Sequence, residues 1–176
     1  MRSNAWRPWM HSEMSIDIDA PPTLVFALAR DVERWAILLP HYVRSRARDR
    51  DAWGRPLVDF IARRPLVATL GIGLPVAWRS RTWNEPETLR LRFEHVAGPT
   101  RGMSVVWDID TRGREDACRV TIRHEFSPRV PGFARFVDRF FTRPIAGRTL
   151  ATFKTLAEAV DSADGSDPTA PTHQTP

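Results

Sequence analysis

The sequence has almost no cysteine, almost no lysine and no long apolar run. Cys118 is the only cysteine among 176 residues, so one chain cannot form an internal disulfide or a metal site of several thiolates. No stretch approaches the roughly 18 consecutive apolar residues that a membrane-spanning helix needs. Residues 1–14 lack the apolar core of a secretory signal, and we therefore expect a cytoplasmic protein.

The scarcity of lysine leaves the positive charge to arginine. Lys154 is the single lysine among 26 basic residues, and the formal net charge is +5. Arginine binds phosphate and carboxylate groups through paired hydrogen bonds, so an anionic partner is one explanation of this excess. Codon usage in a GC-rich genome is the better explanation of the arginine excess, because 21 acidic residues are interspersed with the arginines. Without a helix-turn-helix, zinc-finger or RNA-binding motif, we expect no nucleic-acid partner.

The chain divides by composition into three zones. Residues 1–10 form a short N-terminal arm, and residues 11–161 carry almost all of the apolar content. Residues 162–176 contain no large apolar side chain and are expected to be disordered. The length fits one ligand-binding domain with a substantial core.

Alternation of apolar and polar residues with a period of two predicts most of the secondary structure. In the first strand, Met14, Ile16 and Ile18 alternate with polar residues. Two short helices are expected at 21–32, where two prolines fit the first turn, and at 32–39. Six further strands, separated by turn residues, are expected at 42–50, 55–64, 76–84, 88–96, 103–110 and 118–126.

The last predicted element is a long helix over residues 131–161, where large apolar side chains recur at helical spacing. Pro144 lacks the backbone N–H that a helix interior uses, so a kink or break is expected there. The predicted fold class is therefore α+β. A curved antiparallel sheet of about seven strands, wrapped around the long C-terminal helix, is its economical packing.

The element order and several short motifs resemble one known family. The motifs are Ala20-Pro21, Val25-Phe26, Glu33-Arg34-Trp35, Tyr42 and the closing strand CRVTIRHEFSP with the helix that follows it. Through them, residues 12–161 resemble the polyketide cyclase/dehydrase and lipid-transport superfamily, the START-like or SRPBCC proteins. The resemblance implies the helix-grip fold and a large cavity between the sheet and the C-terminal helix.

Strand phase sorts the side chains into those that face this expected cavity and those that face solvent. The inward set is aromatic and apolar with a few polar groups, as in most small-molecule pockets. The alternative is that the same side chains simply fill a core. The candidate ligand-binding residues are Trp78, Thr82, Phe93, Met103, Trp107, Phe136 and Phe140, with Arg148 or Thr149 as further candidates on the long helix.

Four polar residues are candidates for acid–base chemistry: His95, His124, Ser80 and Tyr42. If both histidines point inward, one strand lies between them and their backbones are about 10 Å apart. Imidazole can act as a general acid or base near neutral pH. No third ligand is near the histidine pair, so we expect no metal and no other cofactor.

The resemblance also assigns positions to two of these residues. Tyr42 matches the pocket tyrosine of the family, and Ser80 matches a serine that some aromatase/cyclases place in the cavity. The arginine expected two residues after that serine is replaced by Thr82, while Arg79 and Arg81 are out of phase. A triad of Ser80, His124 and Asp59 is conceivable, although no G-x-S-x-G motif supports it.

Two main functions remain open from the sequence, and a third is a ligand-sensing or co-chaperone partner module, which an apolar surface patch outside the cavity mouth would favour. The first is binding of a hydrophobic small molecule, which is aromatic, polycyclic or similar to a lipid or quinone. The second is a polyketide cyclase/dehydrase-type reaction that uses polar residues of the cavity, and the missing arginine weighs against it. The apolar segment 65–72 is interpreted as a pocket lid, a homodimer contact, a membrane-surface contact or part of the core.

Overall fold

The computed structural model describes residues 10–67, 72–128, 130 and 132–164. The expected arm at 1–10 and tail at 162–176 therefore lie outside the described residues, apart from Met10 and residues 162–164. Residues 68–71, half of the segment 65–72, also lie outside them, and only the backbone of its two ends is described. The interpretations of these three segments stay predictions.

Seven strands form one antiparallel sheet in the spatial order β1-β7-β6-β5-β4-β3-β2. Their side chains alternate between the core and solvent, as the period of two predicts. The strands are β1 (Met10–Ile18), β2 (Tyr42–Arg50), β3 (Pro56–Val67), β4 (Ile72–Glu85), β5 (Arg90–Ala97), β6 (Ser104–Asp110) and β7 (Cys118–Phe126).

Helical segments lie before β2 and after β7, with one short turn between β4 and β5. The α-helices are α1 (Pro22–Arg30), α2 (Trp35–Leu38), α3 (Phe133–Val137) and α4 (Arg143–Asp164). The short turns are the 3-10 turns η1 (Val32–Arg34) and η3 (Pro86–Thr88) and the π-helical turn η4 (Asp138–Thr142).

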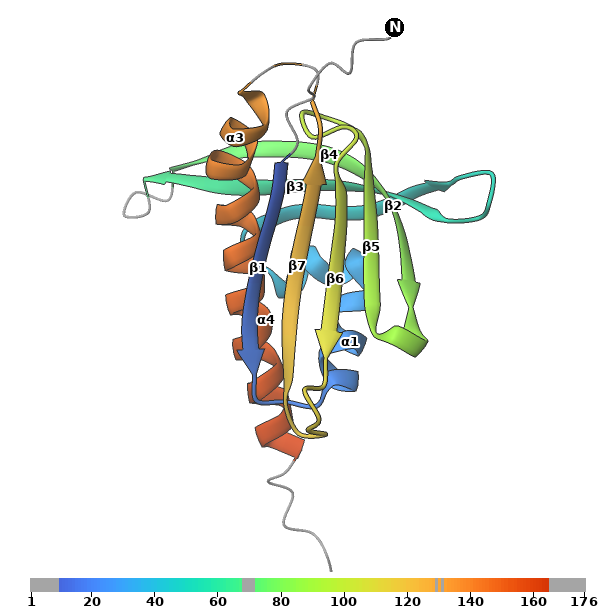
Figure 1. Ribbon diagram of the computed structural model, residues 1–176, viewed down its shortest axis with the longest axis vertical. Coiled ribbons are helices and arrows are strands. Elements are labelled where there is room, and N and C mark those ends of the chain that lie inside the picture. Colours follow the sequence, from blue (N-terminus) through green and yellow to red (C-terminus); the bar gives the residue numbers. More distant parts are fainter. Residues whose placement is uncertain (1–9, 68–71, 129, 131, 165–176) are drawn as a thin grey trace, which may run out of the picture.

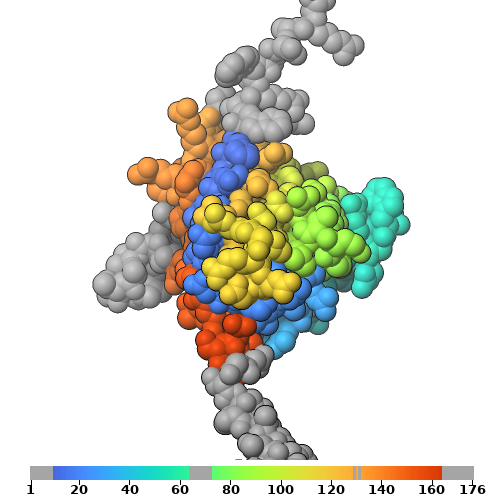
Figure 2. Space-filling model, turned by 60° about the horizontal axis from the view of Figure 1, so that its bottom comes forward, coloured from blue at the N-terminus to red at the C-terminus, as the bar shows by residue number. Residues whose placement is uncertain are grey.

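The sheet is strongly curved around helix α4. Figure 1 shows β1, β7, β6 and β5 running along the molecule, whereas β2, β3 and β4 cross behind them at one end. Helix α4 packs against β1, α1 and β3 on the concave side. In Figure 2 the β6–β7 turn (yellow), the first helix (blue) and the end of α4 (orange-red) lie side by side and close the other end.

This arrangement confirms the predicted helix-grip fold, including the two short helices after the first strand. Strands β2 and β7 have the predicted bounds, and β4 is longer than predicted because it begins at Ile72. Helix α4 ends at Asp164, three residues into the segment predicted to be disordered.

The predicted interruption at Pro144 takes the form of a π-helical turn. Pro144 is the second residue of α4, the helix that directly follows η4. The backbone N–H of Arg143 bonds to the carbonyl of Asp138, five residues earlier. This wider turn precedes the proline, which has no N–H and would crowd an α-helical carbonyl. As a result α3, η4 and α4 continue as one helix instead of breaking (Figure 1).

Trp35 occupies the centre of the core and is 3% exposed. Its indole N–H donates a hydrogen bond to the carbonyl of Ala29, 3.0 Å away, which ties α2 to α1. Because aromatic pairs at such separations attract one another through offset or edge contacts, the indole joins four strands and α4. The rings that surround it at 5.3–5.9 Å belong to Tyr42, Phe60, Phe93, Trp107 and Phe153.

The convex face of the sheet is covered by ion pairs in which a carboxylate lies between two arginines. On β3, Asp59 contacts Arg48 of β2 at 3.1 Å and Arg79 of β4 at 2.6 Å. Asp108 of β6 lies in the same way between Arg90 and Arg123, each at 2.9 Å. Exposed pairs of this kind contribute about 0–1 kcal/mol each.

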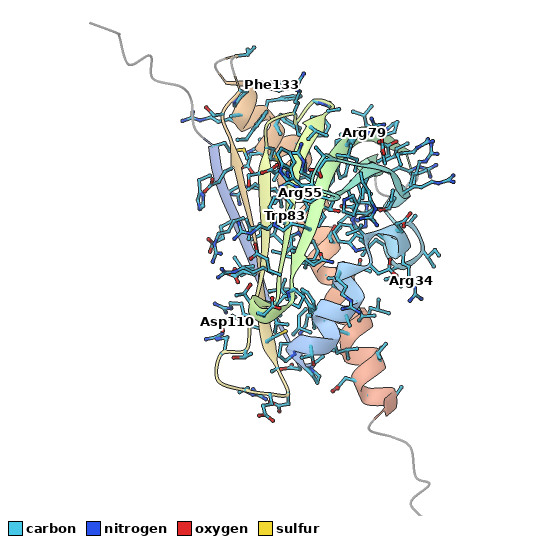
Figure 3. All side chains as sticks on the ribbon, turned by 90° about the vertical axis from the view of Figure 1, so that its right-hand side faces the viewer. Arg34, Arg55, Arg79, Trp83, Asp110 and Phe133 are labelled. Atoms are coloured by element: carbon cyan, nitrogen blue, oxygen red, sulfur yellow. The ribbon has the colours of Figure 1, made fainter. Side chains whose placement is uncertain are left out.

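An aromatic–cation contact belongs to the same face. The guanidinium of Arg55 lies 5.0 Å from the ring centre of Trp53 and 5.1 Å from that of Trp83. Figure 3 shows Arg55 beside Trp83, away from the helices. Many of the arginines of this face, among them Arg55, Arg79 and Arg90, therefore have partners within the molecule.

The turn between β5 and β6 packs closely on β4 through Gly98. This residue has φ of +96°, and a Cβ there would lie 2.6 Å from the carbonyl oxygen of Ala77 and 2.9 Å from the Cα of Trp78. The β4–β5 register shifts at the adjacent residues Arg79 and Ser80. Glycine is therefore required both by the backbone angle and by the neighbouring strand.

Replacing Gly98 by alanine is expected to lower the free energy of unfolding by about 1–3 kcal/mol, because strain and overlap add. Urea unfolding measures the change. The matched control is Gly113→Ala, since Gly113 has φ of +76° and no atom near the position of a Cβ. This variant measures the cost of the backbone angle alone, so its loss of unfolding free energy should be smaller. Equal losses in the two variants would contradict the close packing of Gly98.

Candidate functional site

A cavity of about 80 Å³ lies between the sheet and the helix formed by η4 and α4. Strands β2 to β7 contribute the wall opposite this helix, and the β5–β6 turn contributes one rim. The wall consists of Trp35, Tyr42, Phe60, Val76, Trp78, Phe93, His95, Thr100, Met103, Val105, Trp107, Ile122, His124, Phe141, Thr142, Ile145, Ala146 and Thr149.

This cavity is much smaller than the large one that the resemblance implies. Ordinary small-molecule pockets measure about 300–1,000 Å³. The difference is due to aromatic rings that occupy the interior. Trp35 lies 5.3 Å from Trp107, and Phe60 stacks on Trp78 at 5.4 Å. A polycyclic ligand can enter only if some of these side chains move.

A buried hydrogen bond beside the wall joins the turn before β2 to α4. The hydroxyl of Thr149 donates to the carbonyl of Ile145 at 2.8 Å, and it lies 2.9 Å from Nε2 of His41. Since the single hydroxyl proton is engaged, Nε2 of His41 is the donor in the second bond. Both residues are almost fully buried, and the Tyr42 ring lies 5.0 Å from that of His41.

Burial keeps these side chains uncharged. It lowers the pKa of His41 to about 4, with the positive charge of Arg148 acting in the same direction. Burial also raises the pKa of Tyr42 well above its usual range, although a hydrogen bond with Thr149 acts against this. The cavity wall therefore has a neutral phenol on this side at pH 7, and a neutral imidazole lies beside it, outside the wall.

The two candidate histidines lie on the opposite side of the cavity. His95 on β5 bonds through Nδ1 to the hydroxyl of Thr100 at 2.6 Å and stacks on Trp78 at 5.8 Å. His124 on β7 is buried, faces Ser12 across the β1–β7 ladder, and has no hydrogen-bond partner for Nδ1 among the described residues. As predicted, one strand, β6, lies between the two histidines.

Both of these imidazoles are neutral at pH 7. Burial lowers the pKa of His95 to about 3, and the neighbouring charge of His124 adds to the effect. Burial lowers the pKa of His124 to about 4, against the attraction of the Asp138 carboxylate. Among the described residues, none that lines the cavity carries a formal charge at pH 7.

Most of the predicted site residues lie on the cavity wall, namely Tyr42, Trp78, Phe93, His95, Met103, Trp107 and His124. Ser80 and Thr82 are buried on the same face of β4 but do not line the cavity. The conceivable triad with Asp59 is wrong, because Asp59 lies on the convex face and pairs with Arg79.

The prediction was also wrong for two residues of the long helix. Phe136 and Phe140 do not line the cavity, and Phe136 is 48% exposed. A π-helical turn contains one residue more than an α-helical turn, so it shifts which side chains point toward the cavity. In this segment they are those of Phe141 and Thr142. Of the other two candidates on α4, Thr149 lines the wall and Arg148 is exposed.

Sequence reasoning missed His41 entirely. It follows Pro40 in a turn, where neither strand phase nor helical spacing indicates which way a side chain points. Trp35 was recognised only as a motif residue and not as part of the cavity wall. In the part of the chain that the structure describes, no three metal-binding side chains cluster, and no helix is long and apolar enough to cross a bilayer.

Lowering the pH from about 7 to about 5 is expected to destabilise the protein through the buried histidines His41, His95 and His124. Their pKa values are about 3 to 4 when folded and about 6.5 when unfolded, so the unfolded chain binds more protons between these values. Their contribution is complete above about pH 6.5 and is lost as the pH falls. Urea unfolding should show a slope of up to about 1.4 kcal/mol per pH unit for each histidine.

The variant His124→Gln is expected to flatten this slope, and His41→Gln to do the same. The control is Thr155→Gln at an exposed position of α4, which introduces the same side chain without removing a titratable group and should leave the slope unchanged. A slope that is identical in all three variants and the unaltered protein would contradict the assignment.

Several solved structures share this fold. The Zhui aromatase/cyclase from Streptomyces sp. R1128 superimposes with a TM-score of 0.71 at 19% identity, over 89% of this chain and 98% of that chain. The di-domain ARO/CYC BexL gives 0.65 at 24% identity, over 86% of this chain and 47% of that chain, so this chain spans about half of BexL. A START superfamily protein from Mycobacterium smegmatis gives 0.59 at 15% identity, with coverages of 87% and 97%.

The family described as polyketide cyclase/dehydrase and lipid transport matches residues 10–158 of the sequence. The matched region begins with β1 and ends within α4, so it includes the whole sheet and every residue of the cavity wall. The chain therefore belongs to the polyketide cyclase/dehydrase and lipid transport family.

Proposed function

We propose that this protein binds an uncharged aromatic or polycyclic small molecule in the cavity between the sheet and α4. The observation that carries the proposal is the composition of the wall. Aromatic and aliphatic side chains make up most of it, and its polar members are hydroxyls and neutral imidazoles. Such a wall suits a flat apolar ligand with one or two hydroxyl or carbonyl groups.

The lack of a cation in the wall restricts the ligand class. Moving an anion from water into an apolar interior costs several kcal/mol unless a partner charge meets it. The position at which aromatase/cyclases are expected to place an arginine holds Thr82. Arg79 and Arg81 lie on the convex face in contact with Asp59 and Glu94. Free fatty acids and other carboxylates are therefore disfavoured relative to phenols, quinones and neutral lipids.

Several wall residues can form hydrogen bonds to such a ligand. Nδ1 of His124 has no partner in the described structure, so a ligand hydroxyl or carbonyl that reached it would satisfy a buried polar atom. The phenol of Tyr42 lies across the cavity and can donate or accept. These two groups are suited to fix the orientation of the ligand, while the aromatic rings supply affinity.

The first test compares 2-naphthol with 2-naphthoate, which share a ring system and differ in charge. We expect 2-naphthol to bind at least about tenfold more tightly, as a difference of about 1.4 kcal/mol or more implies. Isothermal titration calorimetry at neutral pH measures both. Equal affinities, or tighter binding of the carboxylate, would overturn the proposal. The matched variant Tyr42→Phe removes only a hydroxyl and should weaken 2-naphthol severalfold while leaving naphthalene unaffected.

The alternative is a cyclase/dehydrase-type enzyme that uses His95, His124 or Tyr42 for proton transfer. The fold shared with the Zhui aromatase/cyclase and the histidines in an apolar cavity favour it. Against it, imidazoles with a pKa of about 3–4 are weak bases, and a general base works best with a pKa near the working pH. The wall also holds no cation to stabilise an enolate.

Enolisation of an aromatic 1,3-diketone tests this alternative directly. We expect the protein to bind benzoylacetone without accelerating deuterium exchange at its central carbon, measured by proton NMR in D₂O. An acceleration that His124→Gln or His95→Gln removes would establish the enzymatic function instead. The variants Thr121→Val and Ser15→Ala provide controls, since these hydroxyls pair with each other on the convex face.

A further inference from the structure

We propose that the helical segment 133–143 docks the mouth of the cavity onto an anionic lipid bilayer. Two adjacent stripes of this segment form the docking face, which consists of Phe133, Phe136, Phe140, Arg135 and Arg139. This proposal does not depend on the identity of the ligand, because the residues of the docking face do not line the cavity. In Figure 3, Phe133 lies at the end of the molecule opposite to Asp110.

The phenylalanines of the docking face form a contiguous row in which Phe136 is exposed and Phe133 and Phe140 are half-buried. Phe136 is 48% exposed, and its ring lies 6.3 Å from that of Phe133 and 4.9 Å from that of Phe140. Phe133 in turn contacts Phe126, at the end of β7. A single exposed phenylalanine needs no explanation, but a contiguous row of rings on one helix is typical of an interaction surface.

The arginines of the docking face differ from those of the sheet. Arg135 and Arg139 are exposed and form no ion pair with any residue that the structure describes, whereas most arginines of strands β3 to β7 contact carboxylates. The one acid of the segment, Asp138, is already held by Arg143 at 2.9 Å. Arginines that border an apolar stripe with no neutralising acids complement a surface of negative charge.

The docking face is connected to the cavity by direct contact. The ring of Phe141 lies 5.7 Å from that of Phe136, and Phe141 also lines the cavity wall, followed by Thr142. Both belong to the π-helical turn that interrupts the regular helix. If Phe136 contacts a bilayer, the side chain of Phe141 is therefore what lies between Phe136 and the cavity.

A lipid surface fits these features better than a folded partner does. An aromatic stripe bordered by arginines can insert its rings at the level of the headgroups and leave its charges among the phosphates. The segment of 11 residues would lie along the interface over about 16 Å. A ligand of the proposed class dissolves in bilayers, so the same contact would bring the cavity to its reservoir.

Co-sedimentation with lipid vesicles tests the proposal. We expect the protein to bind vesicles of equal parts phosphatidylglycerol and phosphatidylcholine at low salt and to remain free with phosphatidylcholine alone. Arg135→Gln combined with Arg139→Gln should weaken binding by about fivefold for each arginine, and Phe136→Ser severalfold. Salt near 1 M should release the protein, because the screening length falls to about 3 Å.

The control variant is Trp53→Ser, which removes a 76% exposed aromatic ring from the β2–β3 turn and should leave vesicle binding unchanged. Binding of 2-naphthol by every variant reports separately on the fold and on the cavity. The proposal is overturned if the unaltered protein stays free with anionic vesicles, or if the docking-face variants bind as well as it does. It is also overturned if light scattering shows a dimer that Phe136→Ser dissociates and no vesicle binding occurs.

Discussion

The packing of the Trp35 indole is the contact on which the rest of the interior depends. Helix α2, which carries it, is only one turn long and could not hold its place by itself. The hydrogen bond from the indole to Ala29 fixes the short helices to each other, and the surrounding rings fix them to the sheet and to Phe153 of α4. The same indole is part of the cavity wall. Stability and ligand binding therefore share one side chain.

This sharing accounts for the small volume of the cavity. Aromatic rings that would contact a flat ligand contact one another in its absence, so the interior stays packed. A bound ligand must replace ring contacts such as that between Phe60 and Trp78 with contacts of its own. The affinity then reflects a difference between two similar sets of interactions. On the helical side of the enclosure, the hydrogen-bonding pattern of the backbone changes at η4.

The sequence was informative wherever a period decides the direction of a side chain. Strand alternation placed Trp78, Phe93 and Trp107 on the cavity side and the neighbouring arginines outside, because a strand has only two faces. Periodicity failed on the helix, because one π-helical turn changes which side chains face the cavity and no residue type in the sequence indicates such a turn. It also failed for His41, whose position depends on a turn and on a partner 108 residues away. The size of the cavity could not be predicted, because it depends on how rings pack and not on which way they point.

On the convex face, loss of a carboxylate and loss of an arginine are expected to have different effects on stability. Asp59 and Asp108 each lie on a middle strand between arginines of the two flanking strands. Loss of one arginine leaves its carboxylate with a second partner. Loss of the carboxylate leaves two guanidinium groups facing each other with nothing between them, so an attraction becomes a repulsion. Substitution of Asp59 or Asp108 is therefore expected to cost more stability than substitution of one of the arginines beside it.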